Sequence, residues 1–224
     1  MEREQEYIRQ IKEQGILPLY YHDDADTSIG IAKALYEAGI RTIEFTNRGP
    51  KALENFKDLV KERTNSMPGL LLAAGTIKTA EHATQFINAG ADILISPVFD
   101  SAVCDVSYMN KVLWIPGCMT PTEIHHAQMA GCSMIKLFPG NLLQPSFIEA
   151  IQPLFQDLYY VVTGGVEVEE KNLTTWFRAG VAGVGLGSKL ITAAIMKGKF
   201  FAELTDHTKT AIAIVKKIRE SIVK

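Results

Sequence analysis

The feature that most constrains the fold is a repeat in which a helix ending in Ala-Gly is followed, within a few residues, by an apolar strand. Its four copies lie at Ala38-Gly39, Ala89-Gly90, Ala130-Gly131 and Ala179-Gly180. The glycine supplies the left-handed residue that ends a helix, and the short link is typical of a loop between a helix and a parallel strand. Between successive copies there is room for one further strand and helix, with candidate strands at residues 70–74, 113–116 and 158–163.

Eight strands result when the first apolar run, residues 16–21, is included. Pro18 within that run suits only an edge strand or the first strand of a barrel. Strands and helices alternate without a linker, so we predict a single α/β domain over residues 1–224. The predicted fold is a (β/α)8 TIM barrel with an extra N-terminal helix at residues 3–14. An open doubly wound sheet would need a Gly-x-Gly-x-x-Gly turn after the first strand, which is absent.

Two helix starts are predicted from capping residues. Asp26, Thr27 and Ser28 are the N-cap candidates for the helix after the first strand. The segment from Thr120 to Glu123 forms a capping box with proline at the first helical position.

Composition excludes several classes of protein. A net charge of -2 gives no electrostatic reason to bind nucleic acid or an anionic membrane, and no apolar stretch is long enough to span a bilayer. The three cysteines are never spaced as Cys-x-x-Cys, which argues against a disulfide framework or a zinc cluster and favours the reducing cytoplasm. His125 and His126 are adjacent and cannot share a helical face, so we expect no metal and no cofactor.

Lys136 interrupts an apolar run, residues 134–138, that otherwise has the composition of a parallel strand buried on both faces. A lone lysine in such a run is most often an edge residue whose amine reaches solvent. If the side chain is buried, loss of water disfavours the ammonium form, and a neutral amine can attack a ketone to form a Schiff base. Lys136 is therefore the candidate nucleophile.

Other polar residues lie at the ends of predicted strands, where barrels carry their chemistry. Glu44 sits inside the strand at residues 42–46 and could act as a general acid and base, with Arg48 following in the loop. Gly75 is expected to let a ligand approach the backbone, and Thr76 offers a hydroxyl. The last two strands end in Gly164-Gly165 and Gly187-Ser188. This pattern predicts a phosphate site made of backbone amides and a helix N-terminus.

Taken in order, a set of short segments also resembles a known family: Ile43–Arg48, Ala74–Thr76, Ile95–Pro97, Ile115–Gly117, Ile135–Pro139, Thr163–Gly165 and Gly187-Ser188. The chain is similar nearly from end to end to the class I 2-keto-3-deoxy-6-phosphogluconate aldolases, which include 4-hydroxy-2-oxoglutarate and 2-keto-3-deoxy-6-phosphogalactonate aldolases. Residues 99–104 and the surroundings of Arg48 (Asn47, Gly49 and Pro50) depart from the family pattern. These departures leave the core chemistry intact and the preferred sugar acid open.

The resemblance implies a role for each candidate residue. Lys136 would form the Schiff base with pyruvate and Glu44 would move protons. The implied substrate-binding residues are Arg48 and Thr76 for the pyruvate carboxylate, Gly164, Gly165, Gly187 and Ser188 for the phosphate, and Pro97 and Phe138, which lie within the shared segments. It also implies a cytoplasmic, homotrimeric carbon-carbon lyase of the Entner-Doudoroff route. Such an enzyme would cleave 2-keto-3-deoxy-6-phosphogluconate to pyruvate and glyceraldehyde 3-phosphate.

Two functions of other classes remain as alternatives. A phosphosugar epimerase would need a second acid at the barrel end to pair with Glu44, and none is apparent. A non-catalytic barrel that binds a phosphate ligand would have no reason to bury Lys136 beside a carboxylate.

Overall fold

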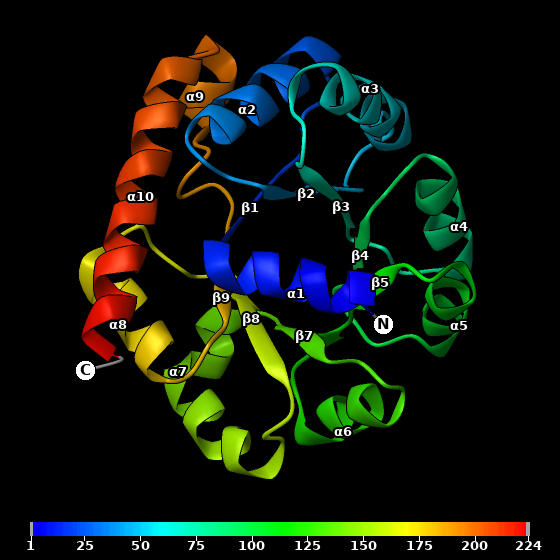
Figure 1. The fold of residues 1–224 in the computed structure, drawn as a ribbon, viewed down its shortest axis with the longest axis vertical. Coiled ribbons are helices and arrows are strands. Elements are labelled where there is room, and N and C mark those ends of the chain that lie inside the picture. The colour runs from blue at the N-terminus through cyan, green and yellow to red at the C-terminus, as the bar shows by residue number, and fades with distance from the viewer. Residues whose placement is uncertain (1, 223–224) are drawn as a thin grey trace.

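The structure, a computed structural model, describes residues 2–222 and is a ring of parallel strands surrounded by helices (Figure 1). The sheet has nine strands in the order β5-β4-β3-β2-β1-β9-β8-β7-β6. In chain order the elements are α1 Glu2–Gln14, β1 Ile16–Tyr20, α2 Ala25–Glu37, β2 Thr42–Thr46, α3 Ala52–Ser66, β3 Leu71–Gly75, α4 Ala80–Asn88, β4 Ile93–Ile95, α5 Ser101–Asn110, β5 Leu113–Ile115, β6 Gly117–Cys118, α6 Pro121–Met129, β7 Met134–Leu137, α7 Gly140–Ile151, η1 Gln152–Leu154, β8 Tyr159–Thr163, α8 Glu170–Arg178, β9 Gly183–Leu186, α9 Ala193–Gly198 and α10 Phe201–Ile222.

The ring closes through β5 and β6, which are one strand interrupted at Pro116. The Ser96 N–H donates to the Ile115 carbonyl (3.1 Å), and the Lys136 N–H donates to the Pro116 carbonyl (2.8 Å). The first half of this strand therefore pairs with β4 and the second half with β7. Counted as one strand, β5 and β6 complete the eight strands of the predicted TIM barrel, which is confirmed.

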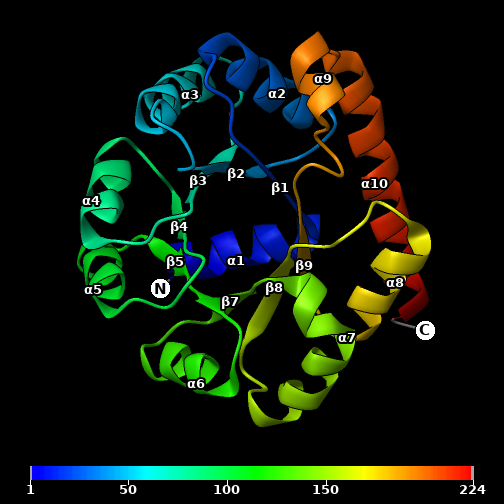
Figure 2. The ribbon, with the colours of Figure 1, turned by 180° about the vertical axis from the view of Figure 1, so that it is seen from behind.

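Aliphatic side chains fill the interior of the barrel, and α1 covers its amino-terminal end. Figure 1 shows α1 lying across the ring, whereas no helix crosses the ring on the opposite side (Figure 2). Ile8 and Ile11 of α1 belong to the same buried cluster as the inward-facing strand residues. Those residues are Leu17, Leu71, Ala73, Ile93, Ile95, Leu113, Ile115, Met134 and Val161. The predicted N-terminal helix thus closes the amino-terminal end of the barrel.

Hydrogen bonds fix α1 in this position. The side-chain amide of Gln14 accepts the N–H of Thr42 (2.9 Å) and donates to the carbonyl of the same residue (2.8 Å), as a neighbouring strand would. From α10, the guanidinium of Arg219 donates to the carbonyls of Glu13 (3.0 Å) and Ala182 (2.6 Å), and burial lowers the pKa of Arg219. These contacts join the first and last helices to the base of the sheet.

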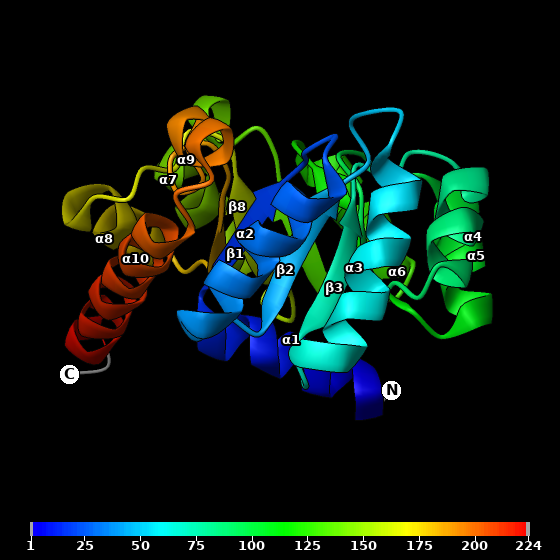
Figure 3. The same ribbon diagram turned by 90° about the horizontal axis from the view of Figure 1, so that it is seen from above.

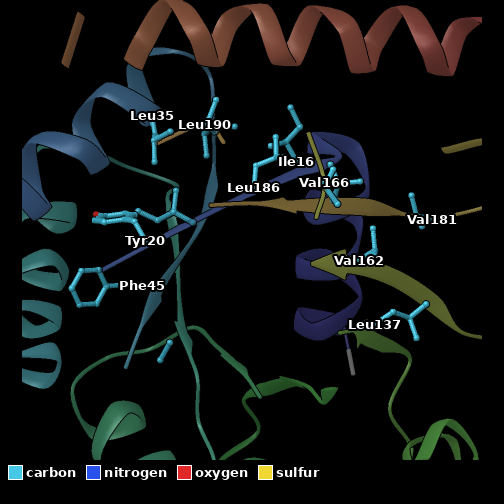
Figure 4. Packing of buried hydrophobic residues seen from close by; sticks show 14 of the residues in the cluster. Ile16, Tyr20, Leu35, Phe45, Leu137, Val162, Val166, Val181, Leu186 and Leu190 are labelled. Atoms are coloured by element: carbon cyan, nitrogen blue, oxygen red, sulfur yellow. The ribbon is translucent and has the colours of Figure 1, made fainter. Parts of the chain in front are cut away.

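The outward-facing strand residues form a second and larger core against the surrounding helices. Figure 4 shows part of this cluster, including Tyr20, Phe45, Leu137 and Leu186. Side chains alternate between the two cores because successive residues of a strand point to opposite faces. This alternation decides which residues reach the centre of the barrel.

The two predicted helix starts had different outcomes. The capping box at Thr120 and Glu123 is confirmed, since each side chain accepts a backbone N–H of the other residue. The N-cap predicted at residues 26–28 was wrong, because the cap of α2 is Asp24, whose carboxylate accepts the Thr27 N–H (2.9 Å). Thr27 and Ser28 instead lie buried inside the first turns of the helix.

Candidate active site

Lys136 and Glu44 meet inside the barrel. Lys136 lies on β7 and Glu44 on β2, strands on opposite sides of the ring. The Nζ atom of Lys136 is 3.3 Å from Oε1 of Glu44, and the two residues are 5% and 0% exposed. The alternative in which the lysine amine reaches solvent from an edge strand is therefore wrong.

The strand pleat explains how two charged residues reach this place from apolar segments. On β7, Ile135 and Leu137 face the helices, while Met134 belongs to the inner cluster. Lys136 therefore points inward, one pleat above Met134. Glu44 points inward in the same way between two outward-facing neighbours, Ile43 and Phe45. The apolar neighbours in sequence are thus not the neighbours of either charge in space.

Gly75 makes room for the Glu44 carboxylate. A Cβ atom at residue 75 would lie 2.1 Å from Oε1 of Glu44, far closer than van der Waals contact allows. The expectation that Gly75 opens the backbone to a ligand is therefore corrected, because the carboxylate already fills the space beside it.

This contact predicts that Gly75→Ala impairs turnover without unfolding the barrel. The added methyl group must push the Glu44 carboxylate away from Lys136, so we expect kcat to fall by about 10²-fold, the lower range for loss of an acid-base group. Steady-state turnover and thermal unfolding would be measured together. An active variant with wild-type kcat would show that the position of the carboxylate does not matter.

Two buried oxygen atoms at the site have no hydrogen-bond partner among residues 2–222. They are Oε2 of Glu44 and the hydroxyl of Thr163, the last residue of β8. Because buried polar atoms are nearly always paired, both are available to a bound water or substrate. No sequence signal marks Thr163 except its position before Gly164. The structure buries it on β8, which pairs with the strand of Lys136, and so makes it a candidate site residue.

Arg48 and Thr76 lie on neighbouring loops, after β2 and β3. The Asn47 N–H donates to the Gly75 carbonyl (2.8 Å), which holds these loops side by side. Arg48 is exposed, whereas Thr76 is partly buried and has a φ of 61°. A β-branched residue rarely adopts this left-handed conformation, and such strain concentrates at ligand sites. Because the two loops are joined by this hydrogen bond, Arg48 and Thr76, the predicted carboxylate ligands, lie at the same edge of the barrel.

Pro97 and Phe138 lie on the same end of the barrel, after β4 and β7. The centroid of the Phe138 ring is 5.7 Å from Nζ of Lys136, so the ring shields one side of the amine. The backbone of Pro97 packs directly on Gly117, where a Cβ atom would lie 2.3 Å from the Pro97 carbonyl oxygen. Pro97 thus shapes the rim by its backbone.

The two glycine-rich ends are neighbours, since β8 and β9 pair with Thr163 opposite Gly185. Gly164 and Gly165 have φ values of 96° and 73°. No helix among the described residues begins directly after either pair, because α8 starts at Glu170 and α9 at Ala193. Instead, a single turn follows Gly187, in which the N–H groups of Leu190 and Ile191 both donate to the Gly187 carbonyl (2.9 Å each), and the phosphate site stays a prediction.

An ion pair joins these two loops. Nζ of Lys189 lies 2.9 Å from Oε1 of Glu167, with both side chains partly exposed. No sequence pattern predicts this pair, which places a cation beside the candidate phosphate site. An exposed pair of this kind contributes little to stability, on the order of 0–1 kcal/mol.

The arrangement suits covalent chemistry on a carbonyl compound. A buried amine beside a carboxylate offers a nucleophile and a proton carrier within hydrogen-bond distance. Within residues 2–222 there is no group of three or more histidine, cysteine, aspartate or glutamate side chains placed to hold a metal ion. Over the same residues, no helix combines the length and apolar character needed to cross a membrane.

Comparison with known proteins agrees with this chemistry. A model of the family described as KDPG and KHG aldolase, where KDPG is 2-keto-3-deoxy-6-phosphogluconate and KHG is 4-hydroxy-2-oxoglutarate, matches residues 7–220. A probable 2-dehydro-3-deoxy-6-phosphogalactonate aldolase of Rhizobium meliloti (strain 1021) is 32% identical over 170 residues, covering 75% of this chain and 78% of that protein. A 2-dehydro-3-deoxy-phosphogluconate aldolase of Treponema pallidum (strain Nichols) is 30% identical over 202 residues, covering 89% and 93%.

A solved structure shows the same relationship. The crystal structure of a 4-hydroxy-2-oxoglutarate and 2-dehydro-3-deoxyphosphogluconate aldolase superposes with a TM-score of 0.80 at 29% identity, covering 93% of this chain and 98% of that one. The match to the family model spans nearly all of the barrel, including β2 and β7 with their buried pair. The chain therefore belongs to the KDPG and KHG aldolase family.

Proposed function

We propose that this protein is a Schiff-base aldolase that cleaves 2-keto-3-deoxy-6-phosphogluconate to pyruvate and glyceraldehyde 3-phosphate. The observation that carries the proposal is the buried pair of Lys136 and Glu44, one pleat above the inner core of the barrel. A pair in this place does not serve packing, because apolar residues would fill the same volume at lower cost in desolvation.

The reaction begins with attack of the Lys136 amine on the C2 ketone. Loss of water from the resulting carbinolamine gives a protonated imine, and Glu44 is close enough to Nζ to carry protons during this step. The Phe138 ring covers one side of the amine and limits the access of water from that direction.

Cleavage follows from the same two residues. Glu44 removes the proton of the C4 hydroxyl, directly or through a water molecule, and the C3–C4 bond breaks with its electron pair passing into the imine. Glyceraldehyde 3-phosphate leaves as the aldehyde, and the pyruvate enamine is protonated at C3. Hydrolysis of the imine then releases pyruvate and restores the amine.

The remaining residues would hold the two ends of the substrate. Arg48 and Thr76, on the loops after β2 and β3, are proposed to bind the carboxylate next to the ketone. The phosphate would lie on the backbone amides near Gly165 and Ser188, after β8 and β9, with Lys189 nearby. A substrate bound in this way would extend across the carboxyl-terminal end of the barrel, over Lys136.

Two related substrates are alternatives. The Rhizobium relative is a probable phosphogalactonate aldolase, which supports 2-keto-3-deoxy-6-phosphogalactonate, an epimer at C4. The family also includes enzymes for 4-hydroxy-2-oxoglutarate, which carries no phosphate. A homotrimer in the cytoplasm is part of the proposal and rests on the resemblance, so light scattering after gel filtration should give three times the chain mass.

Borohydride trapping tests the central proposal. Sodium borohydride reduces an imine to a stable amine, so incubation with pyruvate should add one reduced pyruvyl group, detected by intact mass and located on Lys136 by peptide mapping. An epimerase or a simple binding protein would gain no such adduct. Comparing kcat/KM for the three keto acids would then rank the substrates.

The phosphate site predicts a selective effect of Gly187→Val. A Cβ atom at residue 187 makes only ordinary contacts, the nearest 3.6 Å away on Leu19, so the fold has room for a side chain there, and we expect the valine to hinder approach to the loop amides. We expect KM for the phosphorylated substrate to rise about tenfold, with cleavage of 4-hydroxy-2-oxoglutarate nearly unchanged.

Gly165 is less suitable for this test. Its φ is 73°, and a Cβ atom at residue 165 would lie 2.5 Å from Cβ of Asn141, so any side chain would distort the loop itself. Ser188→Ala is the milder companion to Gly187→Val, because Ser188 is exposed. Equal losses with both substrates in these variants would show that residues 187 and 188 serve folding and not phosphate binding.

A further inference from the structure

Contacts hold the backbone of the loop that carries Arg48 on both sides of the arginine, although they leave the Arg48 side chain free. On the amino-terminal side the Asn47 N–H is bonded to the end of β3, and the Arg48 N–H donates to the Thr46 carbonyl (2.9 Å). The guanidinium has no hydrogen-bond or ion-pair partner among residues 2–222 and is exposed. The backbone therefore presents a positive charge that the protein does not use internally.

On the carboxyl-terminal side the loop is covered by Tyr21, which directly follows β1. Its ring lies against the backbone of Gly49, since a Cβ atom at residue 49 would be 2.3 Å from both Cζ and Oη of Tyr21. The Tyr21 hydroxyl accepts the Lys51 N–H (3.3 Å) and donates to the carboxylate of Asp23. Tyr21 thus packs on Gly49, the residue after Arg48, and hydrogen-bonds the backbone N–H of Lys51.

Further contacts hold Tyr21 and its own loop against β2 and α3, the elements on either side of the Arg48 loop. The Tyr21 ring packs on Phe45 of β2, with 5.7 Å between centroids. From α3, the side-chain amide of Asn55 donates to the carbonyls of His22 and Asp23, both at 2.9 Å. The β1–α2 and β2–α3 loops are therefore one connected unit with Arg48 at its edge.

We propose that Tyr21 is a positioning residue for Arg48, which locks residues 47–51 so that the guanidinium is held ready for the carboxylate of the keto acid. The inference rests on the proposed function, in which Arg48 binds that carboxylate. Glycine at position 49 is what admits the tyrosine ring, because any side chain there would meet it. Preorganising a charged group in this way raises affinity because less ordering is needed on binding.

A double-mutant cycle on Tyr21 and Arg48 tests the proposal. The pyruvate concentration that gives half-maximal borohydride trapping and the KM and kcat for the keto acid would be measured in each protein. Tyr21→Phe keeps the ring and loses the hydroxyl bonds, so KM should rise about threefold, whereas Tyr21→Ala should raise it about tenfold with kcat within about twofold of wild type. In the Arg48→Ala background, Tyr21→Ala should have almost no further effect on KM.

The matched control is Tyr36→Phe, which removes a hydroxyl bond to the Pro68 carbonyl (3.0 Å) on another part of the surface. It should leave KM unchanged. If Arg48→Ala raises KM but Tyr21→Ala leaves KM unchanged, or raises it equally in both backgrounds, the positioning role is wrong while the role of Arg48 stands. If Arg48→Ala does not change KM, the carboxylate site is wrong and the role of Tyr21 is rejected with it.

Discussion

Lys136→Arg should abolish borohydride trapping with pyruvate and lower kcat by about 10⁴-fold or more, a loss typical of removing a catalytic nucleophile. A guanidinium keeps the positive charge beside Glu44 and stays protonated at neutral pH, so it cannot form an imine. The barrel should remain folded because the buried carboxylate keeps a cationic partner. Intact mass after reduction, together with thermal unfolding, measures both parts of this expectation.

Lys136→Met separates chemistry from stability. Methionine fits an apolar interior but leaves the fully buried Glu44 carboxylate without its partner. Breaking a buried pair in this way costs about 3–5 kcal/mol, so this variant should unfold at a clearly lower temperature than Lys136→Arg. A reduced pyruvyl group found on a different lysine of Lys136→Arg would reject Lys136 as the nucleophile.

Glu44→Gln should lower kcat by about 10²-fold to 10⁴-fold in both the cleavage and the synthesis direction, the usual range for a general acid-base residue. Glutamine has nearly the same shape, so it fits beside Gly75, but its amide cannot carry the proton of the C4 hydroxyl. Imine formation should be less affected than carbon-carbon cleavage. Single-turnover trapping with pyruvate and steady-state turnover of the full substrate distinguish the two steps.

Ser107→Ala offers a comparison for Glu44→Gln, because Ser107 is also buried and polar but its hydroxyl donates only to carbonyls of its own helix, α5. Its effect should fall mainly on stability. Turnover in Glu44→Gln equal to that of wild type would mean that another group moves the proton. The orphan hydroxyl of Thr163 would then be the next residue to examine.

The architecture was predictable because its signals are local. Each Ala-Gly helix end recurs before an apolar strand, and the structure places glycines 39, 90, 131 and 180 in the left-handed conformation that the repeat requires. The buried lysine was predictable for a similar reason, since one charge in an apolar strand stands out against its neighbours. Bringing Lys136 and Glu44 together needed only the expectation that strand ends of a barrel converge.

Contacts between segments that are distant in the chain could not be predicted from the sequence. The dependence of Glu44 on Gly75 arises from the register of β2 and β3, where Thr46 lies opposite Gly75. Likewise, Asp24 and not a later residue caps α2, and its carboxylate also pairs with Lys199, which is distant in the chain. Neither choice has a signature in hydrophobic periodicity.

The position of α1 has a practical consequence for attaching the enzyme to a support. Figure 3 shows α1 along one face of the barrel, and on it the side chain of Arg9 is 69% exposed. A cysteine introduced by Arg9→Cys would couple selectively to a maleimide, because burial raises the pKa of the Cys118 and Cys132 thiols to about 12 and also raises that of Cys104. Because α1 covers the amino-terminal end, every molecule tethered there would present the opposite end of the barrel, near Lys136, to substrate in solution.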